Sequence, residues 1–179
     1  MEAIRLKIAD AVILDSAPFR DERGAFEVFW EAGAQSAFSL SIVCGGAFHS
    51  YNRNARTLRG MHYQDHPHAQ ARLVSCVRGS VWDVIVDLRP ESSTFLAWQS
   101  VELSEASGRA VYVPRGCAHG FLTLAANSTV AYLIEGAYVP ESARTLRWDD
   151  PAVGIEWPLP AGVQPMLSDR DRSATDYRK

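Results

Sequence analysis

The sequence predicts an all-β protein in which two sheets pack face to face, with a short helical or loop segment at the C-terminus. Apolar and β-branched residues alternate with polar ones over much of the chain, and helical periodicity is scarce. Turn residues recur about every 8 to 12 positions, which is typical of a sandwich or a small barrel.

Two hairpins are predicted in the middle of the chain. Apolar runs at 73–77 and 81–88 flank a turn at 78–80. Residues 120–139 form a second apolar pair around a turn at 125–128. Shorter strands are expected on the same grounds at 98–104 and 109–114.

Helix is expected only at 31–38 and for a turn or two after Leu167. No repeat, low-complexity stretch or linker divides the 179 residues, so a single domain is predicted. At this length folding buries about 70% of the unfolded chain's surface, which is enough for a core without disulfides.

Composition narrows the class of protein. Cys44, Cys76 and Cys117 are odd in number and widely spaced, so a reducing cytoplasm is expected and no disulfide framework. Neither a secretion leader nor a run of about 18 apolar residues is present, so no membrane partner is predicted. A net charge of -3 argues against a nucleic-acid partner.

Histidines cluster at His62, His66 and His68. A metal-binding jelly roll of the cupin kind holds its ion through a histidine pair, a nearby carboxylate and a later histidine, here His119. Arg72 stands four residues after His68, where the carboxylate would be, and a guanidinium repels a divalent cation. The sequence therefore predicts no metal and no cofactor, and places His66 and His68 in a solvated loop.

His62 lies in a predicted strand, and the sequence allows two roles for it there. Alternation places one set of side chains opposite the other: Leu58, Gly60, His62 and Gln64 on one face, and Arg59, Met61 and Tyr63 on the other. A histidine that points into a small barrel is either a core residue with a hydrogen-bond partner or a residue that moves protons.

Five segments in this order resemble the dTDP-4-dehydrorhamnose 3,5-epimerase family and extend over nearly the whole chain: DERGAF (21–26), TLRGMHYQ (57–64), VRGSVWDVIVDLR (77–89), VPRGCAHGF (113–121) and RWDDPAVGIEWP (147–158). The resemblance implies a cupin-type double-stranded β-helix, or jelly roll, that uses no metal. It also implies a homodimer and a nucleotide-linked 4-keto-6-deoxy sugar as ligand. By the same resemblance, strands in 1–45 are exchanged in the dimer, 46–158 form the barrel, and 159–179 close the site.

Such a sugar calls for a particular set of groups. A C4 ketone acidifies the C–H bonds at C3 and C5, so inversion needs a base, an acid on the other face, and a group that stabilises the enolate. The resemblance assigns the base to His62, its carboxylate partner to Asp171 rather than the neighbouring Asp169, and the acid to Tyr132. Without the resemblance, Tyr132 is an ordinary core aromatic of a strand.

The resemblance also assigns binding roles. Arg72 stands where the family has a lysine that stabilises the enolate, and the planar guanidinium alters that geometry. Arg23 and Arg59 match arginines that bind the diphosphate, a task suited to bidentate donors. His119 matches a histidine that contacts the substrate, and Tyr138 a tyrosine that stacks on the nucleotide base.

Several positions depart from the family pattern. Val28 and Ala143 replace glutamates, and Ala47 and His49 replace a glutamine and an asparagine. Because a site that loses hydrogen-bonding partners for a base loses discrimination for it, we hypothesise that the carrier nucleotide, or the sugar, differs from the family's usual thymidine-linked substrate.

The sequence leaves the inverted centre open between C3, C5 or both. It also leaves a different class of function open, either a sugar-binding module without catalysis or a metal-dependent oxygenase on the same barrel. The missing carboxylate ligand argues against the oxygenase. The joint presence of His62, Tyr132 and Asp171 argues against a mere binder.

Overall fold

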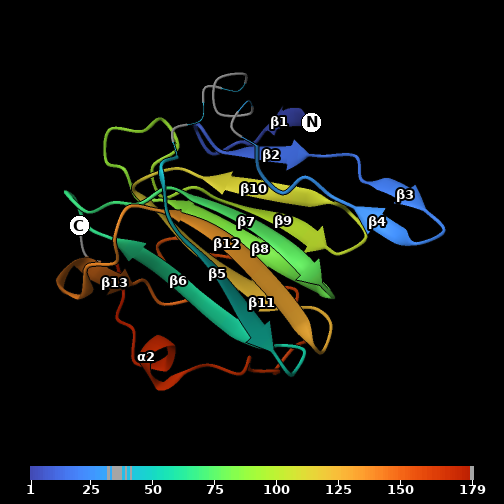
Figure 1. The fold of residues 1–179 in the computed structure, drawn as a ribbon. Coiled ribbons are helices and arrows are strands. Elements are labelled where there is room, and N and C mark those ends of the chain that lie inside the picture. Colours follow the sequence, from blue (N-terminus) through green and yellow to red (C-terminus); the bar gives the residue numbers. More distant parts are fainter. Residues whose placement is uncertain (32, 34–37, 39, 41, 178–179) are drawn as a thin grey trace.

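Two β-sheets packed face to face form the body of the protein in the computed structural model, which describes residues 1–31, 33, 38, 40 and 42–177 (Figure 1). The six-stranded sheet has the order β1 (Glu2–Arg5), β2 (Val12–Asp15), β10 (Arg109–Val113), β7 (Arg72–Arg78), β12 (Ser128–Glu135) and β5 (Cys44–Asn52). The five-stranded sheet has the order β13 (Ala143–Thr145), β6 (Leu58–Gln64), β11 (Cys117–Thr123), β8 (Ser80–Asp87) and β9 (Trp98–Ser104). The all-β prediction is confirmed.

Both predicted hairpins are wrong. β7 and β8 lie in different sheets although only Gly79 separates them, and β11 and β12 also lie in different sheets. Their partners come from farther along the chain, since β8 pairs with β11 and β7 pairs with β10 and β12. In a jelly roll the chain crosses from one sheet to the other at such corners, and turn residues between apolar runs mark a corner as well as a hairpin.

The apolar core fills the space between the sheets on the side of β8, β9 and β10. Its fully buried members include Val81, Leu103, Val111 and Phe121. Burial of an aliphatic or aromatic side chain of this size contributes about 1.5–3 kcal/mol, so this half of the barrel holds the two sheets together. The opposite side, between β5 and β6, is left for polar side chains.

In the described part of the chain, a ribbon and two short helices lie outside the two large sheets. β3 (Phe19–Asp21) and β4 (Gly24–Phe26) form a two-stranded ribbon that projects from the body, and both strands are exposed throughout (Figure 1). The short helices are η1 (Pro140–Ser142) and α2 (Asp169–Arg172), the second of which confirms the helical turn predicted after Leu167. The helix predicted at 31–38 falls mostly outside the described residues. Among the described residues, no helix has the length and apolar character needed to cross a bilayer.

Candidate active site

A pocket of about 330 Å³ opens between the two sheets on the side of β5 and β6. Both sheets contribute polar side chains to it, so these groups face one another across the pocket. Among the predicted site residues that line it, Arg59, His62 and His119 come from the five-stranded sheet, Arg72 and Tyr132 come from the six-stranded sheet, and Tyr138 comes from the loop after β12.

His62 is paired with Asp171. The His62 Nε2 atom lies 2.6 Å from Asp171 Oδ1, and the Asp171 side chain is only 3% exposed. The carboxylate is carried by α2, whose N-cap Ser168 accepts a hydrogen bond from the Asp171 backbone N–H. Burial alone would raise the pKa of Asp171, but hydrogen bonding and charge from His62 hold that pKa below its usual value.

This pair has a defined protonation pattern. An ionised carboxylate only accepts hydrogen bonds, so His62 Nε2 carries a hydrogen and donates it to Asp171. In the neutral imidazole the other nitrogen, Nδ1, then has a free lone pair. The arrangement suits a general base whose imidazolium form is stabilised by a fixed carboxylate.

Tyr132 lies on β12, in the sheet opposite His62. Burial, followed by the charge of Asp83, raises the pKa of its phenol, so the hydroxyl keeps its proton at neutral pH. The His119 ring contacts the Tyr132 ring edge to face, with 6.2 Å between centroids. A protonated hydroxyl on one wall and an imidazole on the other can serve two faces of a bound ring.

Arg72 lines the pocket, and the buried Asp83 contacts His119, another lining residue. Arg72 Nη1 donates to the His62 backbone carbonyl at 3.0 Å, and burial lowers the pKa of its guanidinium. Asp83 is fully buried, and its Oδ2 lies 2.8 Å from His119 Nε2. Burial raises the pKa of Asp83, against the opposing effects of His119 and Arg72.

The expected alternation along β6 is wrong at its centre. Arg59 lines the same pocket as His62, although strict alternation places the two on opposite faces. The register between β6 and β11 shifts between His119 and Phe121, opposite Gly60, and this irregularity turns Arg59 toward the pocket. Gly60 has φ +140° and packs against Gly120, where a Cβ would lie 2.6 Å from the Gly120 Cα.

Sequence reasoning missed several residues that line the pocket, and also Asn52 and Asp83, which contact lining residues. Asn52 is buried and its Oδ1 accepts a hydrogen bond from Arg59 Nε at 2.7 Å, while Arg170 Nε donates to Thr145 Oγ1 at the pocket edge. Asp83 had a signal, because it is an acidic residue inside a continuous apolar run. The other missed lining residues include Phe48, Ser50, Gln64 and Gln70.

Known proteins show the same combination of fold and sequence. The family model for dTDP-4-dehydrorhamnose 3,5-epimerase matches residues 5–179. The chain belongs to the dTDP-4-dehydrorhamnose 3,5-epimerase family. It is therefore a carbohydrate epimerase, an isomerase of deoxysugar biosynthesis.

Individual relatives agree over most of their length. The dTDP-4-dehydrorhamnose 3,5-epimerase of Sinorhizobium fredii (strain NBRC 101917 / NGR234) is 40% identical over 170 residues, which are 94% of this chain and 85% of that protein. The solved Mycobacterium tuberculosis rmlC epimerase has a TM-score of 0.93 and 40% identity, and the match covers 98% and 88% of the two chains. ChmJ, a 3'-monoepimerase from Streptomyces bikiniensis solved in complex with dTDP-quinovose, has a TM-score of 0.87 and 32% identity over 96% and 85%.

In this epimerase, one predicted site residue lies away from the pocket. Arg23 is on the β3–β4 ribbon, its side chain is 82% exposed, and it pairs with Asp21 at 2.6 Å. The departures from the family pattern are also placed differently than expected, because β5 presents Phe48 and Ser50 to the pocket rather than Ala47 and His49. Ala143 does line it.

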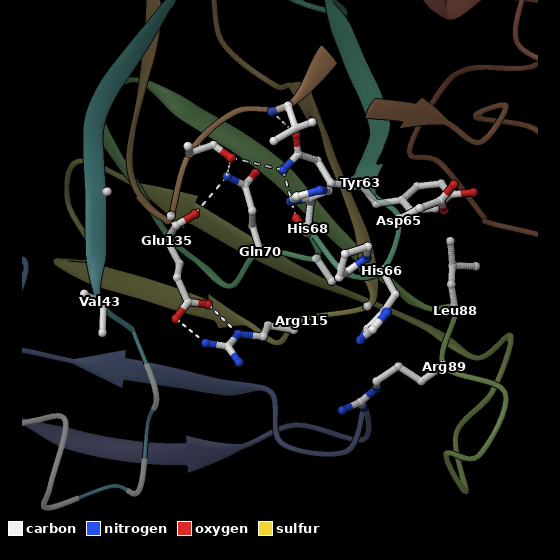
Figure 2. Close-up of a pocket in the computed structure, with 18 of the residues that line it drawn as sticks. Val43, Tyr63, Asp65, His66, His68, Gln70, Leu88, Arg89, Arg115 and Glu135 are labelled. Carbon is white, nitrogen blue, oxygen red and sulfur yellow. Dashed lines mark hydrogen bonds and ion pairs between the residues drawn. The ribbon is translucent and has the colours of Figure 1, made fainter. Parts of the chain in front are cut away.

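The remaining histidines of the cluster lie elsewhere in this epimerase. His66 and His68 are exposed and line a separate cavity of about 880 Å³, together with Arg89 and Arg115 (Figure 2). Arg115 is held by Glu135 in a bidentate ion pair there. In the described part of the chain, no group of three or more His, Cys, Asp or Glu side chains could hold a metal ion.

Proposed function

We propose that this epimerase inverts C3 and C5 of a dTDP-linked 4-keto-6-deoxy sugar by removing and returning protons next to the C4 ketone. The observation that carries the proposal is the His62–Asp171 pair at 2.6 Å, which lies in one pocket with Tyr132 on the opposite sheet. A base and an acid on opposite walls are what inversion at a carbon centre requires.

His62 is the proposed base. It takes the proton from the carbon next to the ketone, and Asp171 stabilises the imidazolium that results. Tyr132 returns a proton on the other face, for which the raised pKa of its phenol keeps the hydroxyl protonated. Both residues then exchange protons with water before the next turnover.

The enolate oxygen needs a positive partner while the C–H bond is broken. Arg72 is the proposed partner, because it lines the pocket beside His62 and one of its N–H groups is already fixed on the His62 carbonyl. His119, beside Tyr132, is the proposed neutral contact to the sugar and is oriented by Asp83.

The diphosphate and the base are proposed to lie toward the pocket mouth. Arg59 commits Nε to Asn52 and keeps both Nη groups for a bidentate contact with phosphate oxygens. Tyr138, 63% exposed, supplies a ring on which a nucleotide base can stack. Thymidine is the proposed base because the relatives' names specify dTDP sugars; those names give no support to the expectation of another carrier.

A homodimer completes the site in this proposal. A two-stranded ribbon is marginally stable alone, and Phe19 and Phe26 on the β3–β4 ribbon are 65% and 70% exposed. Exchange of this N-terminal segment with a second copy would bury both rings and bring Arg23 to the diphosphate. β2 pairs with β10 of its own chain and β1 pairs with β2, so the ribbon is the part proposed to cross.

Inversion at C3 alone is the second candidate, since the related ChmJ is a 3'-monoepimerase. The binding-module and oxygenase alternatives have no support in the relatives, which are epimerases.

Proton NMR of dTDP-4-keto-6-deoxyglucose in D₂O with the protein tests the proposal. We expect loss of the C3 and C5 proton signals and appearance of the inverted sugar. Loss at C3 alone would establish the second candidate. A panel of CDP, GDP and UDP analogues tests the carrier, and faster turnover of one of these would overturn the assignment to thymidine. Absence of exchange with all of them would reject epimerase activity on these sugars.

A further inference from the structure

Tyr138 is the proposed contact to the nucleotide base, yet its own side chain does not fix it. The ring is 63% exposed, and no hydrogen bond, ion pair or ring contact found among the described residues involves it. Its position therefore depends on the backbone of the loop that carries it, between β12 and η1. The contacts that hold this backbone therefore determine where the ring lies.

Two buried glutamines hold it on both sides of Tyr138. Gln64 Oε1 accepts a hydrogen bond from the Val139 N–H at 2.7 Å, and its Nε2 donates to the Ala137 carbonyl at 3.4 Å. Gln70 Nε2 donates to the same Ala137 carbonyl at 3.0 Å and to the Glu135 carbonyl at 2.8 Å (Figure 2). The residues before and after Tyr138 are thus each bound by a side-chain amide.

These side chains have the properties of fixed supports. Gln64 is 3% exposed and Gln70 is 8% exposed, so water does not compete for their hydrogen bonds. Gln64 Nε2 also donates to the His68 carbonyl at 2.9 Å, which ties the 65–69 loop to the Tyr138 loop. Both glutamines line the reaction pocket and also the larger cavity, so they stand between the two spaces.

We infer that Gln64 and Gln70 are positioning residues for nucleotide recognition: they hold the Tyr138 loop so that the ring is preset for the base of the substrate. This inference rests on the proposed function, in which Tyr138 stacks on the nucleotide. A ring that is set before binding does not lose its freedom on binding, which raises affinity. Removal of the Gln64 amide also leaves the Val139 N–H without this partner and loosens the loop.

The test is calorimetric binding of two probes, thymidine diphosphate and inorganic pyrophosphate, to the full-length protein. Gln64→Met keeps the volume and removes the amide. We expect its Kd for thymidine diphosphate to rise about tenfold, as in Tyr138→Ala, with no change in Kd for pyrophosphate. The double variant Gln64→Met/Tyr138→Ala should bind no more weakly than Tyr138→Ala alone, because both changes remove the same contact.

Ser75→Ala is the matched control. Ser75 is also buried, its hydroxyl donates to the Arg109 carbonyl, and neither residue lines the reaction pocket or the larger cavity. The Ser75→Ala variant should leave the Kd values for thymidine diphosphate and for pyrophosphate unchanged. Should Gln64→Met fail to fold, Gln70→Met is the second variant, with the same expected pattern.

Losses that add in the double variant, equal weakening of both probes, or no weakening at all would overturn the inference. Those outcomes leave the proposed epimerisation intact, because proton exchange in D₂O measures it separately. Failure of the unsubstituted protein to bind thymidine diphosphate would overturn both the inference and the proposed carrier.

Discussion

The reaction end of the pocket and its nucleotide end are built differently. At the reaction end, His62, Asp171, Arg72 and His119 each have a partner on a strand or helix of the same chain. Of the residues proposed to bind the nucleotide, Arg23 and Tyr138 are exposed, Arg23 on the ribbon away from the pocket and Tyr138 on a loop that lines it. One chain contains the proposed proton-transfer groups, whereas nucleotide binding is expected to depend on the support of a loop by Gln64 and Gln70 and on a second copy.

The largest effect is expected at the reaction end. His62→Asn should lower kcat/KM by about 10³- to 10⁴-fold, because it removes the proposed base and leaves the fold intact. Steady-state rates measure this. His66→Asn is the matched control, since His66 is exposed and lies outside the reaction pocket. A similar loss of kcat/KM in His66→Asn would contradict the assignment of the base to His62 alone.

Asp171→Asn should have the next largest effect, a loss of about 10²-fold in kcat with little change in KM, because the imidazolium loses its stabilising charge. The neighbouring Asp169, exposed on the same helix, provides the control Asp169→Asn. An equal loss in the control would indicate that α2 acts only as a structural support. Retained kcat in Asp171→Asn would remove the carboxylate from the mechanism.

At the nucleotide end, Arg23→Ala should raise KM about tenfold and leave kcat nearly unchanged, since one diphosphate contact is lost. Mixing it with His62→Asn tests whether that contact comes from a partner. A mixed dimer would contain one site with both residues intact, so activity at low substrate should recover. Absence of recovery in mixed dimers, with each variant folded, would contradict exchange of the ribbon.

The smallest effect on catalysis is expected from Asp87, which is as tightly paired as Asp171 but is not part of the pocket. Burial alone would raise the pKa of Asp87, yet hydrogen bonds from Arg89, Ser92 and Thr94 lower it to about 2. A depressed pKa contributes stability that is present above the unfolded value near 3.8 and is lost as pH falls toward about 2.

Asp87→Asn should therefore reduce the free energy of unfolding at pH 7 by about 2 kcal/mol and leave kcat unchanged. Denaturant unfolding at several pH values measures this, and the difference from the unsubstituted protein should shrink as pH falls. A loss of kcat without loss of stability would show that tight pairing outside the pocket also matters for catalysis.

Much of the reaction end could be predicted from the sequence. The alternating runs predicted the sheets. The motifs assigned His62, Tyr132 and Asp171 to one site although these residues are far apart in the chain, and the structure places them close together. The strand partners could not be predicted, because the turn at Gly79 looks the same whether the chain folds back or crosses to the other sheet. Arg59 and His62 line the same pocket because the register shifts between β6 and β11, and a rule of strict alternation cannot predict such a shift.

The supports of the nucleotide end were also outside the reach of the sequence. Gln64, Gln70 and Asn52 act through backbone carbonyls, backbone N–H groups or another side chain brought close only by folding. No spacing rule marks a buried amide of this kind. The feature that suggests the proposed second copy is the exposed aromatic pair of the ribbon, Phe19 and Phe26.

The most direct test of the central claim compares Tyr132→Phe with His62→Asn by NMR in D₂O, with the dTDP-linked 4-keto sugar. If base and acid act from opposite walls, His62→Asn abolishes deuterium incorporation, whereas Tyr132→Phe still exchanges the C–H proton and returns it without inversion. Unimpaired inversion in Tyr132→Phe, or exchange that persists in His62→Asn, would contradict the account.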